Sequence, residues 1–213
     1  PINRSEWHEG YYERQLRQKV IEPLERVYGV DFSDAALTEA IGRHNELCRV
    51  ISAMGELRKA ENPVITGYEF AVMQLCSLTC PKDLILPLLR ETLEELQGRE
   101  PEPKPWYRAR VMVVGSEIDD PEFTKMLEMC GAYVCADRYC FGTLPGREEI
   151  ELREGETPLH AIARHYLWNN HCPRAMGPKA LIERKNYVYQ KAKEFGAEGL
   201  IVESMKFCEY WGY

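Results

Sequence analysis

The amino-terminal half of the chain shows the periodicity of amphipathic helices. Between residues 11 and 28, apolar residues recur at every third or fourth position, which places them on one face of a helix. Gly29 then supplies a stop, and Ser33 offers an N-cap for a second, longer helix. We expect the two apolar faces to be formed by Leu16, Val20, Leu24 and Val27 in the first helix and by Leu37, Ile41, Leu47, Val50 and Met54 in the second.

Residues 59–104 continue the helical pattern, but prolines interrupt it. We expect breaks around Pro63, Pro81 and Pro87, because proline lacks the backbone N–H that a helix interior needs. A charged, proline-rich connector, REPEPKPWYRAR, follows. The helical segment is therefore predicted to cover residues 1–104.

After the connector, the pattern changes to short strands that alternate with helices. The runs RVMVVGS, AYVCADRYC and EGLIVESM are predicted strands, since they are short and mostly apolar. Helical patterns separate them, and strands joined in this way form parallel sheets through right-handed crossovers. The predicted fold class is α/β, with a Rossmann-like parallel sheet flanked by helices at residues 105–213 and a helical N-terminal segment.

The carboxyl ends of the predicted strands are the expected ligand sites, because open parallel sheets bind ligands outside those ends. Three stretches qualify, namely Gly115 to Glu117, Asp137 to Cys140, and Ser204 to Cys208, and two of them carry a cysteine. The stretch VVGSEIDD has one glycine and matches neither the dinucleotide nor the Walker pattern. A dedicated phosphate loop is therefore not expected.

Charge and hydropathy exclude several classes of partner. The formal net charge is −7, and no basic stripe is visible, so we expect no nucleic acid and no anionic membrane as a partner. No apolar run approaches the roughly 20 residues of a membrane span, and the start PINRSEWHEG lacks a signal-peptide core. The expected location is the cytoplasm.

Two of the eight cysteines are candidates for function, and reduced thiols are expected because the chain carries no export signal. Cys208 follows a predicted strand beside Lys206, where a thiolate could ligate iron or zinc or attack a substrate. A buried structural role is the alternative, since free cysteine is among the most buried residues. Cys140 also follows a strand, before FG.

Other cysteine and histidine spacings do not predict a metal site. Cys130, Cys135 and Cys140 are five residues apart, which is neither a zinc nor a ferredoxin spacing. Cys76 and Cys80 lie four apart and are interpreted as core or interface. We expect no zinc pair from the two helical histidines, His160 and His165, because a spacing of five separates them around the helix. Cys172 has no predicted role.

Charged residues at the strand tips have two interpretations. Arg138 and Lys206 could stabilise a developing oxyanion on a substrate or bind a phosphate. The structural alternative for Arg138 is an ion pair with its neighbour Asp137. Sequence alone leaves both interpretations open.

Several segments in order resemble one protein family. LRKAENPVITGYEF, RVMVVGSEIDDPEFTKMLEMCGAYVCADRYCFG, TPLHAIARHYL before CP, and GAEGLIVESMKFCEYWGY are similar to the D-component of 2-hydroxyacyl-CoA dehydratases, a family that includes subunits of ATP-dependent benzoyl-CoA reductase. The resemblance implies two Rossmann-like domains with a 4Fe-4S cluster held between them by three cysteines. It also implies an acyl-CoA substrate, an ATP-hydrolysing iron–sulfur activator protein and a second subunit, either a homologous sister chain or another copy.

The resemblance assigns Cys208 to the last cluster ligand of the family, with Cys140 as a further candidate beside it. The expectation is that the strand tip of Cys140 neighbours that of Cys208, and that aromatic residues shield the cleft. The family's other two ligands lie in a preceding domain, so the resemblance implies a middle-to-carboxyl-terminal piece without a complete cluster site, inactive on its own. The aromatic candidates are Tyr139, Phe141, Phe207, Tyr210 and Trp211.

Three functions remain open at this point. The first is the iron–sulfur subunit of a radical enzyme, in which one low-potential electron drives dehydration of a 2-hydroxyacyl-CoA or reduction of an aromatic acyl-CoA. The second is a non-catalytic partner subunit of such a complex. The third is a double-cubane iron–sulfur reductase of the same family, for which Cys140 and Cys172 would be the local candidates for extra ligands.

Overall fold

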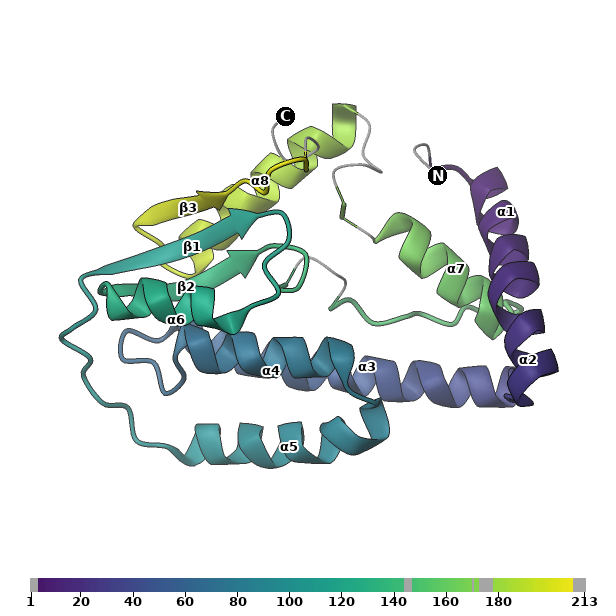
Figure 1. Cartoon of the computed structure of the whole chain (residues 1–213), viewed down its shortest axis with the longest axis horizontal. Helices are drawn as coiled ribbons and strands as arrows, with labels where there is room; N and C mark the ends of the chain where they lie inside the picture. Colours follow the sequence, from purple (N-terminus) through teal and green to yellow (C-terminus); the bar gives the residue numbers. More distant parts are fainter. Residues whose placement is uncertain (1–3, 144–146, 170, 173–177, 209–213) are drawn as a thin grey trace.

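The computed structural model describes residues 4–143, 147–169, 171–172 and 178–208. Helices dominate the chain, and a small sheet lies at one end of the molecule (Figure 1). In chain order the elements are α1 (Glu6–Leu16), the π-helix η1 (Arg17–Ile21), α2 (Glu22–Tyr28), α3 (Asp34–Glu56), the 3-10 helix η2 (Leu57–Lys59), α4 (Gly67–Thr79), α5 (Lys82–Gly98), β1 (Ala109–Gly115), α6 (Pro121–Met129), β2 (Ala132–Arg138), α7 (Pro158–Trp168), α8 (Pro178–Glu194) and β3 (Gly199–Glu203).

The three strands form one parallel sheet in the order β2-β1-β3, which confirms the predicted α/β class (Figure 1). Alternate residues of the central strand β1 point to opposite faces. Val111 and Val113 pack with α6, whereas Met112 packs with α8. Helices therefore cover both faces of β1, which explains why its sequence is almost continuously apolar.

A β-bulge at Cys135 changes the direction of the side chains that follow it in β2. Val111 of β1 pairs with Val134, but the next residue of β1, Met112, pairs with Ala136, so Cys135 is the extra residue. Cys135 and Ala136 consequently pack on the same face, towards α8. The bulge thus shifts the alternation by one position just before the carboxyl end of the strand.

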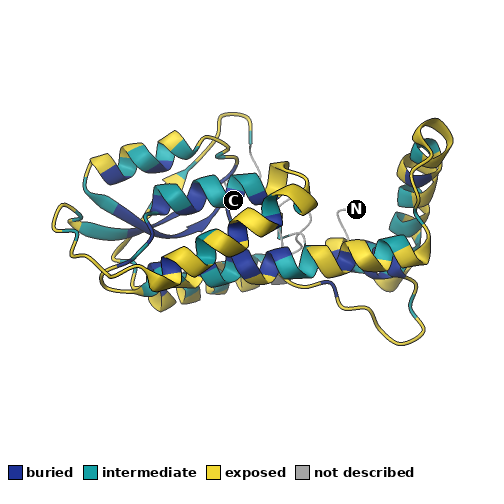
Figure 2. Cartoon of the chain, turned by 90° about the horizontal axis from the view of Figure 1, so that it is seen from below, coloured by how far each residue is buried: buried dark blue, intermediate teal, exposed yellow. Residues whose placement is uncertain are grey.

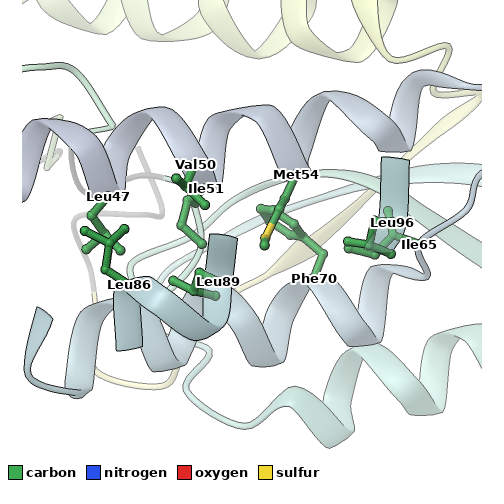
Figure 3. Close-up of a cluster of buried hydrophobic side chains, with 9 residues drawn as sticks. All are labelled: Leu47, Val50, Ile51, Met54, Ile65, Phe70, Leu86, Leu89 and Leu96. Atoms are coloured by element: carbon green, nitrogen blue, oxygen red, sulfur yellow. The ribbon is translucent and has the colours of Figure 1, made fainter. Parts of the chain in front are cut away.

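The helices α3, α4 and α5 share a separate hydrophobic core. Thr66 and Glu69 form a capping box that starts α4, and the Ser33 hydroxyl accepts a hydrogen bond that starts α3, as predicted. Figure 2 shows buried residues on the inner sides of these packed helices and exposed residues on their outer sides. The core side chains interdigitate between the helices in Figure 3 and are Leu47, Val50, Ile51, Met54, Ile65, Phe70, Leu86, Leu89 and Leu96.

A buried carboxylate joins this helical layer to the sheet. Glu128 of α6 accepts hydrogen bonds from the backbone N–H groups of Gly67 at 2.8 Å and Tyr68 at 3.2 Å, at the start of α4. An acidic group is favourable at a helix amino terminus, where the free N–H groups carry positive charge. Position 67 requires glycine, because a Cβ there would lie 2.7 Å from the Val134 carbonyl oxygen.

Two local predictions of the sequence are wrong. Pro87 does not break the chain but lies inside α5, whereas Pro81 is at the N-cap of that helix. The apolar face expected in the first helix is not buried as a whole, because Val20 and Val27 are exposed and Ile21 is buried instead. The π-helical turn η1 accounts for this difference, since its extra residue per turn shifts which positions face the rest of the protein.

The helices α1 and α7 form a second helical layer. Helix α7 packs against α1 and α3 (Figure 1). His160 of α7 hydrogen-bonds Glu13 at 2.9 Å, and His165 lies beside His44 of α3, with ring centroids 6.1 Å apart. The two helical histidines therefore contact different elements. None of the helices in the described ranges combines the length and apolar character needed to cross a membrane.

The first prediction concerns the helical core. Leu89→Ala should lower the free energy of unfolding by about 2–5 kcal/mol, because Leu89 is only 3% exposed and its removal leaves a cavity between the helices. Its neighbour Leu88 is 57% exposed, so Leu88→Ala is the matched control and should change the unfolding free energy by about 0.5 kcal/mol or less. Urea denaturation measures both. Equal losses in the two variants would contradict the packing described here.

The second prediction concerns pH. Burial, Lys82 and His165 lower the pKa of His44 from 6.5 to about 4, and the backbone of Glu148 opposes this shift. The folded state therefore binds its proton less readily than the unfolded state, so the stabilising effect is complete above pH 6.5 and is lost as the pH falls towards 4. The unfolding free energy of the wild type, measured by urea titration at several pH values, should fall more steeply in this window than that of His44→Gln. A constant difference between the two proteins across the window would refute the prediction.

Candidate functional site

The carboxyl ends of the three strands meet at one edge of the sheet, as expected for parallel strands (Figure 1). The central strand β1 separates the ends of β2 and β3 by two strand spacings, roughly 10 Å. The expectation that the strand tip of Cys140 neighbours that of Cys208 is therefore wrong. The order of strands depends on the direction of each crossover, which residue patterns do not encode.

Ser116, directly after β1, connects the loops of both flanking strands. Its carbonyl oxygen accepts a hydrogen bond from the Cys140 backbone N–H at 2.7 Å. Its hydroxyl group donates to Glu203 Oε2 at 2.9 Å and accepts from the Met205 backbone N–H at 3.1 Å. Ser116 is fully buried, so water does not compete for these hydrogen bonds. One side chain and its peptide group thus position both cysteine-bearing loops.

Glu203, the last residue of β3, bonds to the end of β1. Its carboxylate also accepts a hydrogen bond from the Ser116 backbone N–H at 3.2 Å. Gly115 makes this approach possible, because a Cβ at that position would lie 2.6 Å from the Glu203 carbonyl oxygen. The chain winds in opposite directions on the two sides of β1, and the crevice at such a switch point is the usual ligand site of an open α/β sheet.

Cys208 is half-buried in a turn that follows β3. Its backbone N–H donates to the Met205 carbonyl oxygen at 3.0 Å, and the intervening Phe207 adopts a positive φ of 75°. Phe207 is 89% exposed, and the Lys206 ammonium lies 5.2 Å from its ring centroid. Phe207 therefore projects into solvent and does not shield the thiol. Tyr210 and Trp211, the other aromatic candidates near Cys208, lie outside the described residues.

The cysteines do not gather at this edge. Cys140 is half-buried at the end of β2, Cys130 is exposed at the amino-terminal edge of the sheet, and Cys135 is buried, with its thiol donating to the Val111 carbonyl oxygen at 3.3 Å. All eight cysteines lie in the described ranges, and no disulfide joins them. Among the described residues, no group of three or more His, Cys, Asp or Glu side chains has the arrangement of a metal site.

Arg138 and Lys206, the two predicted catalytic side chains, have different surroundings. Arg138 is 2% exposed, and its guanidinium stacks on the Tyr187 ring of α8 at 4.1 Å. Burial lowers its pKa from the usual value of an arginine. Lys206 is exposed in the turn before Cys208. The bulge at Cys135 explains the position of Arg138, because it directs this side chain towards α8.

The buried ion pair of the site joins Asp137 to Arg58 of η2, not to Arg138 as considered from the sequence. The Asp137 Oδ2 and Arg58 Nη1 atoms are 2.9 Å apart, and both side chains are nearly inaccessible. Adjacent residues in a strand point to opposite faces, so Asp137 and Arg138 cannot pair within the same strand. Sequence analysis missed Arg58, although its spacing of four from Met54 places a charged residue in line with the apolar face of α3, in the turn that continues this helix.

A cavity of about 470 Å³ lies between α8 and the first residues of β3. Mostly apolar side chains line it, among them Leu181, Val188 and Leu200. Its lining includes the first residues of β3 and Val114 of β1, but neither Ser116 nor Cys208. Its lining contains no thiol, so it does not combine with the candidate site.

Comparisons with known proteins place these observations in a family. The family described as 2-hydroxyglutaryl-CoA dehydratase, D-component, matches residues 1–213. The chain is 25% identical over 189 residues to the (R)-phenyllactyl-CoA dehydratase beta subunit of Clostridium sporogenes, which covers 89% of this chain and 49% of that protein. It is 24% identical over 192 residues to the lactoyl-CoA dehydratase subunit beta of Anaerotignum propionicum, covering 89% of this chain and 50% of that protein.

The family match extends over the whole chain, and the resemblance noted from the sequence motifs is thereby confirmed. The chain belongs to the 2-hydroxyglutaryl-CoA dehydratase D-component family. It spans about half the length of the curated relatives that it matches.

The third prediction tests the buried ion pair. Asp137→Asn should lower the free energy of unfolding by about 3–5 kcal/mol in phosphate-free buffer, because it leaves the Arg58 guanidinium buried without its carboxylate. Glu149→Gln removes the partner of Arg49 in an exposed ion pair and should cost about 1 kcal/mol or less. Denaturant unfolding distinguishes the two. A loss for Asp137→Asn as small as that of the control would contradict a structural role for the pair.

Proposed function

We propose that this member of the 2-hydroxyglutaryl-CoA dehydratase D-component family forms part of an enzyme that removes water from a 2-hydroxyacyl-CoA thioester. The observation that carries the proposal is the family match over residues 1–213. Two relatives support the substrate class, because phenyllactyl and lactoyl groups are both 2-hydroxyacyl groups. The rest of the substrate differs between them, so the side chain of the acyl group stays open.

The candidate site for this chemistry is the carboxyl edge of the sheet, where Ser116 positions the loops of Cys140 and Cys208. We propose that Cys208 is one ligand of a 4Fe-4S cluster, with Cys140 as a further cofactor contact. When bound, such a cluster would supply the low-potential electron that dehydration of an unactivated 2-hydroxyacyl group needs. We propose the partners accordingly: an ATP-hydrolysing iron–sulfur activator and a second subunit, either a homologous sister chain or another copy.

The described residues agree with this assignment only in part. A 4Fe-4S cluster is usually held by four cysteine thiolates, and the described part of this chain has no cluster of three or more metal-binding side chains. The half-buried thiol of Cys208 is accessible at the sheet edge and suits a single ligand position. The remaining ligands would then come from outside the described residues.

A non-catalytic partner subunit is the second candidate function. Both relatives are named as beta subunits, so each of their enzymes contains more than one kind of chain. A beta-type chain could keep the fold and the contacts with its sister subunit without holding a cluster itself. A measurement of bound iron separates the two candidates, because only the first requires it.

The fourth prediction concerns Cys208. Full-length protein reconstituted with iron and sulfide under anaerobic conditions should bind iron and acid-labile sulfide and give an EPR signal after reduction. Cys208→Ala should lose the iron or retain a three-iron cluster, because one thiolate ligand is missing. The matched control is Cys130→Ala, which removes an exposed thiol at the opposite edge of the sheet and should bind iron as the wild type does.

The outcome also decides between the two functions. The cluster assignment is supported if the wild type takes up iron and only Cys208→Ala takes up less. Turnover of 2-hydroxyacyl-CoA with the activator then tests dehydration against reduction of an aromatic acyl-CoA. A wild-type protein that takes up no iron would remove the cluster proposal and favour the partner subunit. Equal iron content in all three proteins would show that Cys208 is not a ligand.

A further inference from the structure

A polar cavity of about 150 Å³ lies beside the carboxyl end of β2, on the side of the candidate site away from Cys208. It is enclosed by α3, η2, the end of β2, the loop after β2 and α8. Charged and hydroxyl side chains from these elements converge on it: Arg58, Asp137, Thr143, Arg147, Tyr187 and Lys191. The proposed cluster ligand uses none of them.

Three cations, Arg58, Arg147 and Lys191, and three carboxylates, Glu56, Asp137 and Glu148, line this cavity, and Arg138 adds a fourth cation against the lining residue Tyr187. The Arg58 guanidinium pairs with Asp137 at 2.9 Å. Arg147 instead donates to the neutral amide oxygen of Gln74 at 2.6 Å, and Arg138 stacks on the Tyr187 ring. Arg138 and Arg147 form no ion pair with a carboxylate within the ranges that the structure describes, although Glu148 attracts Arg138 and Asp137 attracts Arg147 at longer range. The other charged groups at the rim are already paired: Glu56 with Lys59, Lys191 with Glu194 at 2.8 Å, and Glu148 with His171 at 3.0 Å.

The arginines also hold unused hydrogen-bond donors. The Nε atoms of Arg58, Arg138 and Arg147 are buried, and none has a hydrogen-bond partner among the described residues. Buried polar groups are nearly always hydrogen-bonded, and each exception requires an explanation. Because the donors belong to cations, the group that would satisfy them is an anion, bound directly or through water.

Aromatic rings hold two of these guanidinium groups in place. The Phe70 ring lies 3.7 Å from the Arg58 guanidinium carbon and 4.8 Å from that of Arg147. One ring thus contacts two cations, which repel each other. Burial and the charge of Arg58 lower the pKa of Arg147 to about 10, and the Asp137 carboxylate only partly opposes this shift.

We propose that this cavity binds a phosphate group, with Arg147 and Arg58 as hydrogen-bond donors and Arg138 adding positive charge beside Tyr187. A guanidinium group matches phosphate oxygens through two parallel hydrogen bonds. Phosphate carries a charge of roughly −1.5 to −2 near neutral pH. This charge would balance the positive charges of Arg138 and Arg147, which form no ion pair with a carboxylate among the described residues. A single carboxylate would leave one of them uncompensated.

Two sources can supply this chemistry. One is free inorganic phosphate, and the other is a phosphate of the coenzyme A thioester, which rests on the proposed function. The second source would place the anionic part of the substrate at the tip of β2, while the thiol of Cys208 stands at the tip of β3. Binding of inorganic phosphate tests the cavity without any assumption about the substrate or the cluster.

The fifth prediction tests the cavity by isothermal titration calorimetry of the full-length protein with inorganic phosphate. Wild type should bind phosphate, and Arg147→Gln should bind it at least about tenfold more weakly, which corresponds to 1.4 kcal/mol. Arg153→Gln is the matched control, because Arg153 is an exposed arginine of the same loop and should leave the affinity unchanged. Lys191→Gln provides a second variant at the rim and should weaken binding by a smaller factor.

Thermal unfolding separates ligand binding from a purely structural role of Arg147. Phosphate should raise the melting temperature of the wild type and of Arg153→Gln, and this rise should be lost in Arg147→Gln. If Arg147 served only to bond Gln74 and stack on Phe70, the variant would instead melt lower by the same amount with and without phosphate.

Competition identifies the source of the phosphate group. Displacement of phosphate by coenzyme A but not by pantetheine, with the same loss in Arg147→Gln, would assign the cavity to the substrate. Phosphate binding that coenzyme A does not displace would assign it to the free anion and would leave the proposed function untouched. Absence of phosphate binding to the wild type at millimolar concentration, or equal affinity in Arg147→Gln, would overturn the proposal.

Discussion

The buried ion pair between Arg58 and Asp137 is the constraint on which the arrangement of the molecule depends. Arg58 follows the long helix α3, and Asp137 is the penultimate residue of the strand β2, so the pair fixes the helical layer against the sheet. Two charges removed from water are costly unless each finds the other and further hydrogen bonds complete the geometry. Asp137 satisfies this condition, because it also accepts the Thr143 backbone N–H at 2.6 Å. The loop after β2, and with it the cavity lined by Arg147, is held by the same carboxylate.

A single inserted residue prepares this geometry. The bulge at Cys135 directs Arg138 towards α8, and the adjacent Asp137 points the other way, towards Arg58. On the other side of the sheet, Ser116 sets the loops after β2 and β3 by short hydrogen bonds from one buried residue. The two devices act on neighbouring strand ends, so the candidate thiol and the cationic cavity are both fixed relative to the tip of β1.

The sequence predicted what depends on local pattern. Strands, helices, the stop at Gly29, the cap at Ser33 and the break at Pro81 follow from residue types within a few positions, and the structure has them. It did not predict the strand order, the partner of Asp137 or the face that α1 and α2 bury, because these depend on contacts between distant segments and on a π-helical turn. The loop position of Cys208 was predictable, but its role as a ligand and the boundary near residue 104 stay predictions.

The net charge of the chain bears on how the proposed anion reaches its cavity. With a formal charge of −7, the protein surface as a whole repels a polyanion such as a coenzyme A thioester, so long-range attraction cannot accelerate its capture. Affinity must then come from contacts made after desolvation, where charge-assisted hydrogen bonds from guanidinium groups are strongest. The buried arginines that form no ion pair with a carboxylate, Arg138 and Arg147, meet this requirement within an otherwise acidic chain. Binding of this kind would be less sensitive to ionic strength than binding to an exposed basic surface, because salt screens buried charges poorly.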